Sequence, residues 1–368
     1  MITKPKDKIS TIQATLAISA TIIGVGILTL PRTAGKAVGT PDIWLAVLLG
    51  GLIVLVFGYI VAKLSQRFPD KTFFEYSLDI TGKSIGYLIN IFIVVYFTLL
   101  AAYEARILAE LIRTYLLSRT PIEVIITIFI SVGVYLVVGG INPLVRIFEF
   151  FFPIVVFLFL FTMFIGLSIF ELENLRPVLG QGIMPVLKGV QATALSYLGF
   201  EIMLIFTSFM EKPKDAVKAT FIGISLTIVC YLITVVVAIG GLTVKEAQSL
   251  TWPTAAVAAE GEIPGAFLER FEVFFTIMWT LAIFTTYAIA HYISGLGLGQ
   301  IFKRNINPFI YGLVPVIYII AMAPQNLNTV FQLGDILSYM AILTSGIIPT
   351  TLLLIAMIRG IGNEKKKF

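Results

Sequence analysis

Long apolar runs dominate this chain and restrict it to folds that a lipid bilayer can hold. Hydrophobic residues make up 58% of its 368 residues and charged residues only 13%, and the mean hydropathy is +0.97. Ordinary soluble domains carry about 25% charged residues, so this composition indicates an integral membrane protein. Because backbone polar groups find no water in the bilayer core, the runs are expected to form membrane-spanning helices of about 20 residues.

Apolar runs between charged or proline-rich segments predict ten transmembrane helices. They lie at residues 10–36, 42–65, 85–117, 121–139, 144–170, 184–210, 217–242, 267–300, 308–323 and 332–358. No polar stretch between them is long enough to house a soluble domain, so residues 1–368 are expected to form a single all-α transmembrane domain.

The basic residues predict how the chain is oriented. Ten spans put both termini on one side of the membrane, and positive charge is retained in the cytoplasm. Most of the 26 Lys and Arg residues fall on the side of the termini: Lys4, Lys6, Lys8, Lys63, Arg67, Lys71, Lys83, Arg146, Lys212, Lys214, Lys218, Lys303, Arg304, Arg359 and Lys365 to Lys367. Both termini are therefore predicted to be cytoplasmic. Topology and contact with anionic lipid explain the net charge of +5 without a nucleic-acid partner.

The chemistry-bearing residues are few. Cys230 is the single cysteine and His291 the single histidine, which excludes an intramolecular disulfide and disfavours a metal or redox centre. No phosphate-binding glycine loop or Cys/His pair is present in the sequence. We therefore expect no enzyme activity, no cofactor and no metal.

Two apolar runs are interrupted by small residues at corresponding positions of the two halves. Gly24-Val25-Gly26 interrupts the first run, and Ser196-Tyr197-Leu198-Gly199 interrupts the sixth, about 173 residues later. Five spans per half give an inverted-topology repeat, with halves at about 10–170 and about 184–358. Such paired breaks are typical of a ligand site near the bilayer midplane, as in the leucine-transporter-like fold.

The residues around both breaks resemble known families. The first break, with Ile27 and Leu28, and the second, with Phe200 and Glu201, are similar to those of the amino acid, polyamine and organocation (APC) transporter superfamily. The wider sequence resembles a narrower family, the endospore germination permeases, which are the B subunits of nutrient germinant receptors. That resemblance rests on Gln13, on Thr29-Leu30-Pro31-Arg32, on Phe68-Pro69-Asp70-Lys71-Thr72 and on Arg176-Pro177.

This resemblance implies a sensor rather than an enzyme. It implies that the chain binds a small neutral amino acid such as L-alanine in the spore inner membrane and signals through receptor subunits A and C. The alternative is an amino acid transporter driven by H⁺ or Na⁺. The fifth span lacks the core lysine that supports proton coupling in some transporters, whereas Thr285-Thr286 leaves a sodium site open.

The breaks themselves predict what they bind. A helix that restarts after a break exposes N–H groups that favour a carboxylate, and freed carbonyls around Ser196 to Leu198 can accept from an ammonium group. The candidate ligand-binding residues are Gly24, Val25, Gly26, Tyr96, Leu100, Ser196, Tyr197, Leu198, Gly199, Thr285, Thr286 and Tyr287. The competing interpretations are tight helix packing for the glycines and hydrogen bonds to the helix's own carbonyls for the hydroxyls.

Three titratable residues in apolar runs are candidates for gating or proton response: Glu201, Glu104 and His291. Glu201 can instead hold the broken helix to its neighbours, and a lone histidine in a bundle often serves packing. Glu104 begins a charged stretch that continues to Arg106, Glu110 and Arg113. We expect these four to form an outward-facing, solvated ion-pair cluster, with a gating or interaction site as the alternative.

Overall fold

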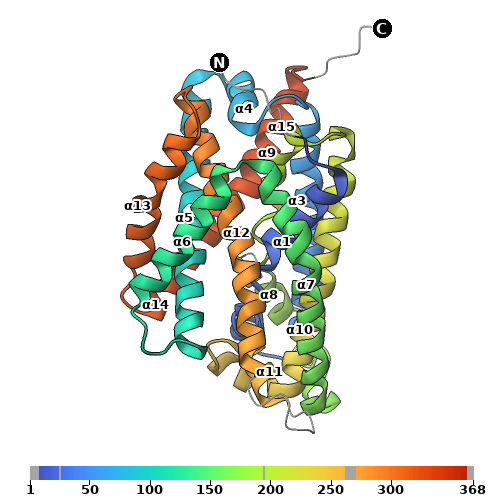
Figure 1. Ribbon diagram of the computed structural model, residues 1–368. Coiled ribbons are helices and arrows are strands. Elements are labelled where there is room, and N and C mark those ends of the chain that lie inside the picture. Colours follow the sequence, from blue (N-terminus) through green and yellow to red (C-terminus); the bar gives the residue numbers. More distant parts are fainter. Residues whose placement is uncertain (1–7, 25, 194, 262–270, 363–368) are drawn as a thin grey trace.

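Helices form all the regular structure of the residues described by the computed structural model, which are 8–24, 26–193, 195–261 and 271–362 (Figure 1). The α-helices are α1 (Thr11–Ile23), α2 (Gly26–Val38), α3 (Ile43–Gln66), α4 (Phe73–Thr81), α5 (Lys83–Tyr115), α6 (Ile122–Val138), α7 (Ile141–Gly166), α8 (Met184–Ala192), α9 (Met203–Phe206), α10 (Ala216–Ser249), α11 (Pro253–Glu260), α12 (Phe271–Ile301), α13 (Asn307–Met322), α14 (Leu327–Ala341) and α15 (Ile348–Ile358). Short 3₁₀ turns and one π-helical segment, Ile342–Ile347, join some of them.

Six helical segments of the described residues are long and apolar enough to cross a bilayer. They are Ile43–Gln66, Lys83–Tyr115, Ile141–Ile169, Pro213–Ser249, Val273–Ile301 and Leu327–Ile358. The bent pair α1 and α2 makes a seventh if it is counted as one span. The predicted fourth and ninth spans correspond to shorter apolar helices, α6 and α13, of 17 and 16 residues. The chain is thus an all-helical integral membrane protein.

The predicted sixth span differs most from a regular helix. Among the described residues between 184 and 210, only α8, of nine residues, and α9, of four, are α-helical. The rest of the described residues there include 3₁₀ turns at Leu195–Tyr197, Phe200–Ile202 and Thr207–Phe209. This segment is therefore interrupted over a longer stretch than the four residues that the sequence singles out.

Local hydrogen bonds explain where several helices begin and how α2 tolerates a proline. Ser10 and Gln13 form a capping box that starts α1, and Asn326 does the same with Thr329 for α14. Pro31 lies inside α2 and lacks the N–H that would bond the carbonyl of Ile27. The Thr254 hydroxyl donates to that carbonyl at 2.9 Å, so α11 replaces the missing bond.

The broken segments lie inside the bundle. Helix α1 packs against α7, α10 and α12, while α2 packs against α8, α10 and α11. Among the described residues, the most extensive contact between two helices joins α5 to α12. Outward-facing side chains are large and apolar, as a lipid-facing surface requires; Tyr135, Leu88 and Phe164 are 88%, 72% and 69% exposed.

One end of the bundle gathers the residues next to both termini. Helices α4 and α15 lie at this end in Figure 1, and α11 lies at the other. The backbone N–H of Ile9 donates to the Phe209 carbonyl at 2.8 Å. Two basic side chains close the same end, since Arg67 donates to the Ile361 carbonyl at 2.9 Å and Arg359 to that of Ile80 at 2.9 Å. Both ends of the described chain are therefore on one side of the bundle.

Candidate functional site

The first break lies between α1 and α2, whose axes differ by 50°. Gly24 follows the end of α1 with a non-helical backbone (φ −43°, ψ −126°). A Cβ at Gly24 would stand 2.5 Å from Thr286 Oγ1 and 3.3 Å from Glu104 Oε1. Glycine therefore allows α5 and α12 to bring these two side chains against the break. Val25, the middle residue of the predicted motif, lies outside the described residues.

The second break is held by Glu201. Its Oε2 accepts the backbone N–H of Gly199 at 2.9 Å, and its Oε1 accepts the Tyr96 hydroxyl at 2.6 Å. Gly199 has φ +126°, and a Cβ there would stand 2.9 Å from the Ile22 nitrogen. Glycine is therefore required both for the backbone angle and for the close approach of the two breaks.

A small cavity lies where the two breaks meet α5 and α12. Its walls are Thr21, Ile22, Gly26, Leu100, Tyr103, Glu104, Leu198 and Thr286. The space open to the centre of a water molecule is about 10 Å³, roughly enough for one water. The cavity has a polar side, with a buried carboxylate and two hydroxyl-bearing side chains from α5 and α12, and an aliphatic side. In this conformation it is closed to anything as large as an amino acid.

Hydroxyl groups lie over the carbonyls that the first break leaves without helical partners. Thr286 Oγ1 donates to the Thr21 carbonyl at 3.0 Å. Thr285 Oγ1 donates to the Ala282 carbonyl of its own helix at 2.7 Å and lies 3.4 Å from the carbonyl of Ala20. The Tyr231 hydroxyl is 2.7 Å from the Ile22 carbonyl and also contacts that of Ser196. In this conformation the Tyr231 hydroxyl already contacts the Ser196 carbonyl, and acceptance of a ligand ammonium by that carbonyl stays a prediction.

Several predicted ligand residues point away from the cavity. Tyr96 is bound to Glu201, and the Tyr197 hydroxyl donates to the Val47 carbonyl of α3 at 2.8 Å. Tyr287 packs on Phe129 of α6, and its hydroxyl is 3.0 Å from His291 Nδ1. Among the described residues, the cavity wall therefore does not include the three tyrosines, Thr285, Gly24, Ser196 or Gly199.

His291 joins two helices. Its Nε2 lies 3.0 Å from the carbonyl of Ile310 on α13, so Nε2 carries the proton and Nδ1 accepts from the Tyr287 hydroxyl. Both ring nitrogens are thereby used in a buried contact between α12 and α13.

Sequence reasoning missed three residues of the cavity wall: Thr21, Ile22 and, with the largest polar side chain of the three, Tyr103. It is buried, and its hydroxyl has no hydrogen-bond partner among the described residues. A helical pattern contained the signal, because Tyr103 follows Leu100 by three residues and Tyr96 by seven on one face of α5.

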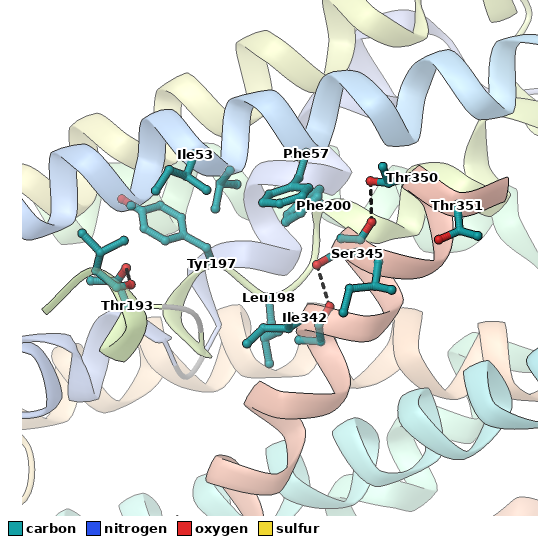
Figure 2. A pocket seen from close by; sticks show the side chains of 16 residues that line it. Ile53, Phe57, Thr193, Tyr197, Leu198, Phe200, Ile342, Ser345, Thr350 and Thr351 are labelled. Carbon is teal, nitrogen blue, oxygen red and sulfur yellow. Dashed lines mark hydrogen bonds between the residues drawn. The ribbon is translucent and has the colours of Figure 1, made fainter. Parts of the chain in front are cut away.

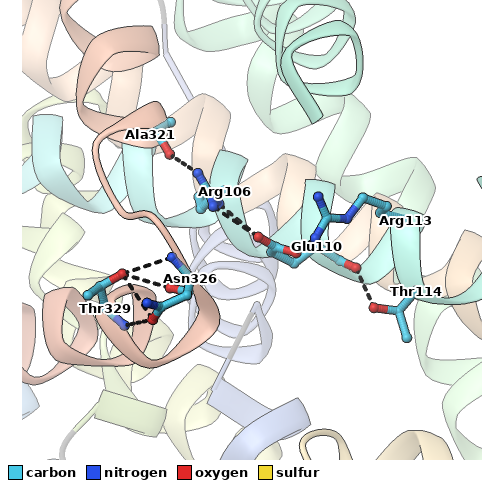
Figure 3. A network of polar contacts seen from close by, with 7 residues as sticks. All are labelled: Arg106, Glu110, Arg113, Thr114, Ala321, Asn326 and Thr329. Atoms are coloured by element: carbon cyan, nitrogen blue, oxygen red, sulfur yellow. Dashed lines mark hydrogen bonds and ion pairs between the residues drawn. The ribbon is translucent and has the colours of Figure 1, made fainter. Parts of the chain in front are cut away.

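The charged stretch of α5 is buried rather than solvated, which corrects the expectation of an outward-facing cluster. Arg106 pairs with Glu110 at 3.0 Å, and both side chains are about 5% exposed. Arg106 also donates to the Ala321 carbonyl at the end of α13 at 3.0 Å (Figure 3). Only Arg113, 47% exposed, reaches the surface from its 3.3 Å contact with Glu110. The pair links α5 to α13. This part of α5 is therefore packed against another helix and is not in contact with solvent.

Two larger pockets border the broken segments. An apolar pocket of about 420 Å³ lies between α3, the sixth segment and the π-helical segment, with Tyr197, Leu198 and Phe200 on one wall (Figure 2). Leu198 lines both this pocket and the central cavity. A second pocket, of about 400 Å³, lies between α2, α8 and α14, and its lining includes the charged residues Lys36, Lys188 and Asp335.

Solved structures share this fold. The chain superposes on MhsT in complex with L-phenylalanine with a TM-score of 0.71, covering 96% of this chain and 99% of that one at 12% identity. It superposes on MHP1, a nucleobase-cation-symport-1 family transporter in a closed conformation with bromovinylhydantoin bound, with a TM-score of 0.69 and 14% identity, covering 97% and 81%. At these identities the likeness concerns the fold alone.

Sequence relatives are closer. Spore germination protein YndE of Bacillus subtilis (strain 168) is 44% identical over 98% of this chain and 99% of its own length. Spore germination protein A2 of the same organism is 34% identical over 90% and 91%, and GerLB of Bacillus cereus is 30% identical over 97% of each chain. Residues 8–330 match the family described as spore germination protein, or spore permease. The chain therefore belongs to the family of spore germination proteins.

Proposed function

We propose that this chain is the ligand-sensing membrane subunit of a nutrient germinant receptor and that it binds a small neutral amino acid, of the size of L-alanine, between its two broken segments. The observation that carries the proposal is the central cavity, which combines a carboxylate and hydroxyls with an aliphatic wall of Ile22, Leu100 and Leu198. A zwitterion with a short apolar side chain has matching chemistry. The N-terminal end of α2, at Gly26, faces the cavity and favours its carboxylate.

Binding of an amino acid would require the two broken segments to move apart, and a sensor can pass such a conformational change on to partner subunits. The cavity holds roughly one water, so an amino acid fits only if the broken segments separate. A ligand that binds the opened state more tightly shifts the population toward it. In the proposal the shift passes to receptor subunits A and C. The activity is sensing, with no catalytic step, cofactor or nucleic acid.

The proposed architecture is ten spans in two inverted repeats of five, at about 10–170 and about 184–358, with both termini in the cytoplasm and the chain in the spore inner membrane. Two observations support it. The shorter helices α6 and α13 are apolar and lie in the bundle beside α5, and structures of transporters superpose on nearly the whole chain.

A binding titration tests the proposal. The full chain in lipid nanodiscs is titrated calorimetrically with L-alanine and other amino acids, for wild type, Leu198→Phe and the control Leu88→Phe. Leu198 borders the cavity, whereas Leu88 is 72% exposed on the lipid-facing surface. We expect saturable binding by wild type and control and at least a tenfold weaker affinity for Leu198→Phe, because the added volume fills the site. A folded wild type that binds no amino acid contradicts the proposal.

A second candidate function is amino acid transport. It is favoured by the Thr285 and Thr286 hydroxyls, which lie against the Ala20 and Thr21 carbonyls at the break, oxygen ligands of the kind that sodium takes. Uptake of radiolabelled L-alanine into proteoliposomes, with and without a Na⁺ or H⁺ gradient, separates the two. Binding without uptake supports the sensor, and gradient-driven accumulation supports the transporter.

A further inference from the structure

The apolar pocket beside the broken sixth segment opens on the outside of the bundle. Its mouth is formed by Ile53 of α3 and by Ile342 and Ile347 of the π-helical segment, whose side chains are exposed (Figure 2). Leu198 and Phe200 also line the pocket, and they are only 7% and 3% exposed. The pocket therefore extends from the outer surface of the bundle to the buried broken segment.

The mouth of the pocket is continuous with the lipid-facing surface, near the centre of the bilayer. Leu52, Val56 and Leu343 neighbour the mouth on α3 and the π-helical segment, and all three are apolar and exposed. The pocket residues of α3, from Gly50 to Phe57, occupy the middle third of that membrane-crossing helix. Because hydrocarbon chains of lipids fill the bilayer at this depth, they are the molecules that meet the mouth.

The lining of the pocket suits a hydrocarbon chain. None of the described residues that line it carries a charge, and most of them are aliphatic or aromatic. Its volume of about 420 Å³ lies within the range of about 300–1,000 Å³ that is typical of small-molecule sites. An empty pocket loses packing contacts, so a chain that fills it is stabilised by dispersion, without burial of a charge.

Leu198 connects this pocket to the central cavity, because it lines both. The central cavity has room for roughly one water, so an amino acid enters only if its walls, Leu198 included, move apart. The apolar pocket is the free space on the other side of Leu198. A lipid chain in that space opposes an outward displacement of the side chain.

We propose that the apolar pocket binds one acyl chain of a bilayer phospholipid, and that the bound chain restrains Leu198 and thereby weakens binding of the amino acid. The lipid site stands on the geometry of the pocket, whereas its coupling to the amino acid rests on the proposed function. Coupling between two sites is reciprocal, so the amino acid in turn favours release of the chain.

Photocrosslinking tests the lipid site. The full chain is reconstituted with a phospholipid that carries a diazirine near the end of one acyl chain, and the labelled residues are mapped by mass spectrometry. We expect label at the exposed Leu88 and also at Leu198 and Phe200, which are too buried for lipid outside the pocket to reach. Label confined to outward-facing residues such as Leu88 overturns the site and indicates a protein partner as the occupant.

Two variants close the pocket in different ways. A Cβ at Gly346 would stand 3.4 Å from the Phe57 ring, an ordinary contact, so Gly346→Leu places a side chain in the pocket. Its matched control is Gly312→Leu in α13, where a Cβ meets nothing within 4 Å. Ile53→Trp obstructs the mouth, and its control is Val56→Trp, an exposed position of the same helix that does not line the pocket.

Both pocket variants are expected to lose most of the label at Leu198 and Phe200 and to keep the label at Leu88, whereas both controls resemble wild type. Label at the two buried residues that persists in a folded pocket variant overturns the lipid site. Ile53→Trp provides this comparison if Gly346→Leu does not fold.

The coupling is tested on the wild type. Saturating L-alanine is expected to lower the label at Leu198 and Phe200 by about half or more, with the label at Leu88 unchanged. Label that does not respond to bound L-alanine overturns the coupling and leaves the lipid site standing. A wild type that binds no amino acid contradicts the proposed function and the coupling together, and the lipid site is then decided by the label at Leu198 and Phe200.

Discussion

Gly26 begins α2 in direct contact with the backbone of the sixth segment. A Cβ at this position would stand 2.6 Å from Ser196 Cα and 2.8 Å from the Tyr231 hydroxyl. The neighbour on the first side is main chain, which cannot turn aside as a flexible side chain can. The contact therefore requires glycine, and any larger residue must push the two broken segments apart.

Gly26→Ala is expected to weaken L-alanine binding by at least tenfold, because the methyl group separates the cavity walls that must close on the ligand. The matched control is Gly312→Ala in α13, where a Cβ meets nothing within 4 Å. The measurement is the dissociation constant by calorimetry in nanodiscs. Equal affinities for the two variants would refute the role of the close approach at Gly26.

At the scale of elements, the two breaks are stabilised by neighbouring intact helices. Helix α10 contributes Tyr231, and α12 contributes Thr285 and Thr286, whose hydroxyls lie over carbonyls that no longer have helical partners. Helix α5 contributes Tyr96, which fixes Glu201 at the second break. Unwound backbone inside a membrane persists only where protein groups satisfy it, so these contacts are the reason the breaks can exist.

Tyr231→Phe tests this role. The single proton of this hydroxyl is available to the carbonyls of Ile22 and Ser196, so its removal leaves one of these buried carbonyls without a donor, at a cost of about 1–3 kcal/mol. We expect the thermal unfolding midpoint of the purified protein to fall by a few degrees. Tyr135→Phe is the control, because Tyr135 is 88% exposed on α6. A midpoint for Tyr231→Phe equal to that of the control would show that the hydroxyl does not stabilise the break.

At the scale of the whole molecule, one end of the bundle carries Arg67, Lys214 and Arg359. The first and the last described residues of the chain lie at the same end. Arg67 bonds the Ile361 carbonyl, Arg359 that of Ile80, and the Lys214 carbonyl accepts from Gln66. Positive residues gathered at one end are what the charge rule for membrane topology requires of a cytoplasmic face.

Cysteine labelling tests this orientation. Cys230 is buried, so replacing it with alanine gives a background for single-cysteine variants. Arg304→Cys lies on the side expected to be cytoplasmic, and Arg119→Cys lies between α5 and α6 on the opposite side. In intact cells a membrane-impermeant maleimide should label Arg119→Cys, and Arg304→Cys only after permeabilisation. The reverse pattern would invert the proposed topology.

The sequence by itself determined the membrane setting, the helical class, the positions of the long apolar helices and the family, because these follow from composition, run length and local motifs. It also identified Gly26, Leu100, Leu198, Thr286 and Glu104, which line the cavity. Glycines at breaks and carboxylates in apolar runs are conspicuous because each is costly in a membrane helix unless it has a purpose.

Only the tertiary structure decided which faces of the helices look inward. Tyr96, Tyr197 and Tyr287 turn to neighbouring helices, while Tyr103 lines the cavity. It likewise buried Arg106 and Glu110, because the end of α13 offers Arg106 a carbonyl and Arg106 in turn pairs with Glu110. Periodicity tells which residues of a helix share a face, but the rotation of that face about the helix axis is decided by packing against residues far away in the chain.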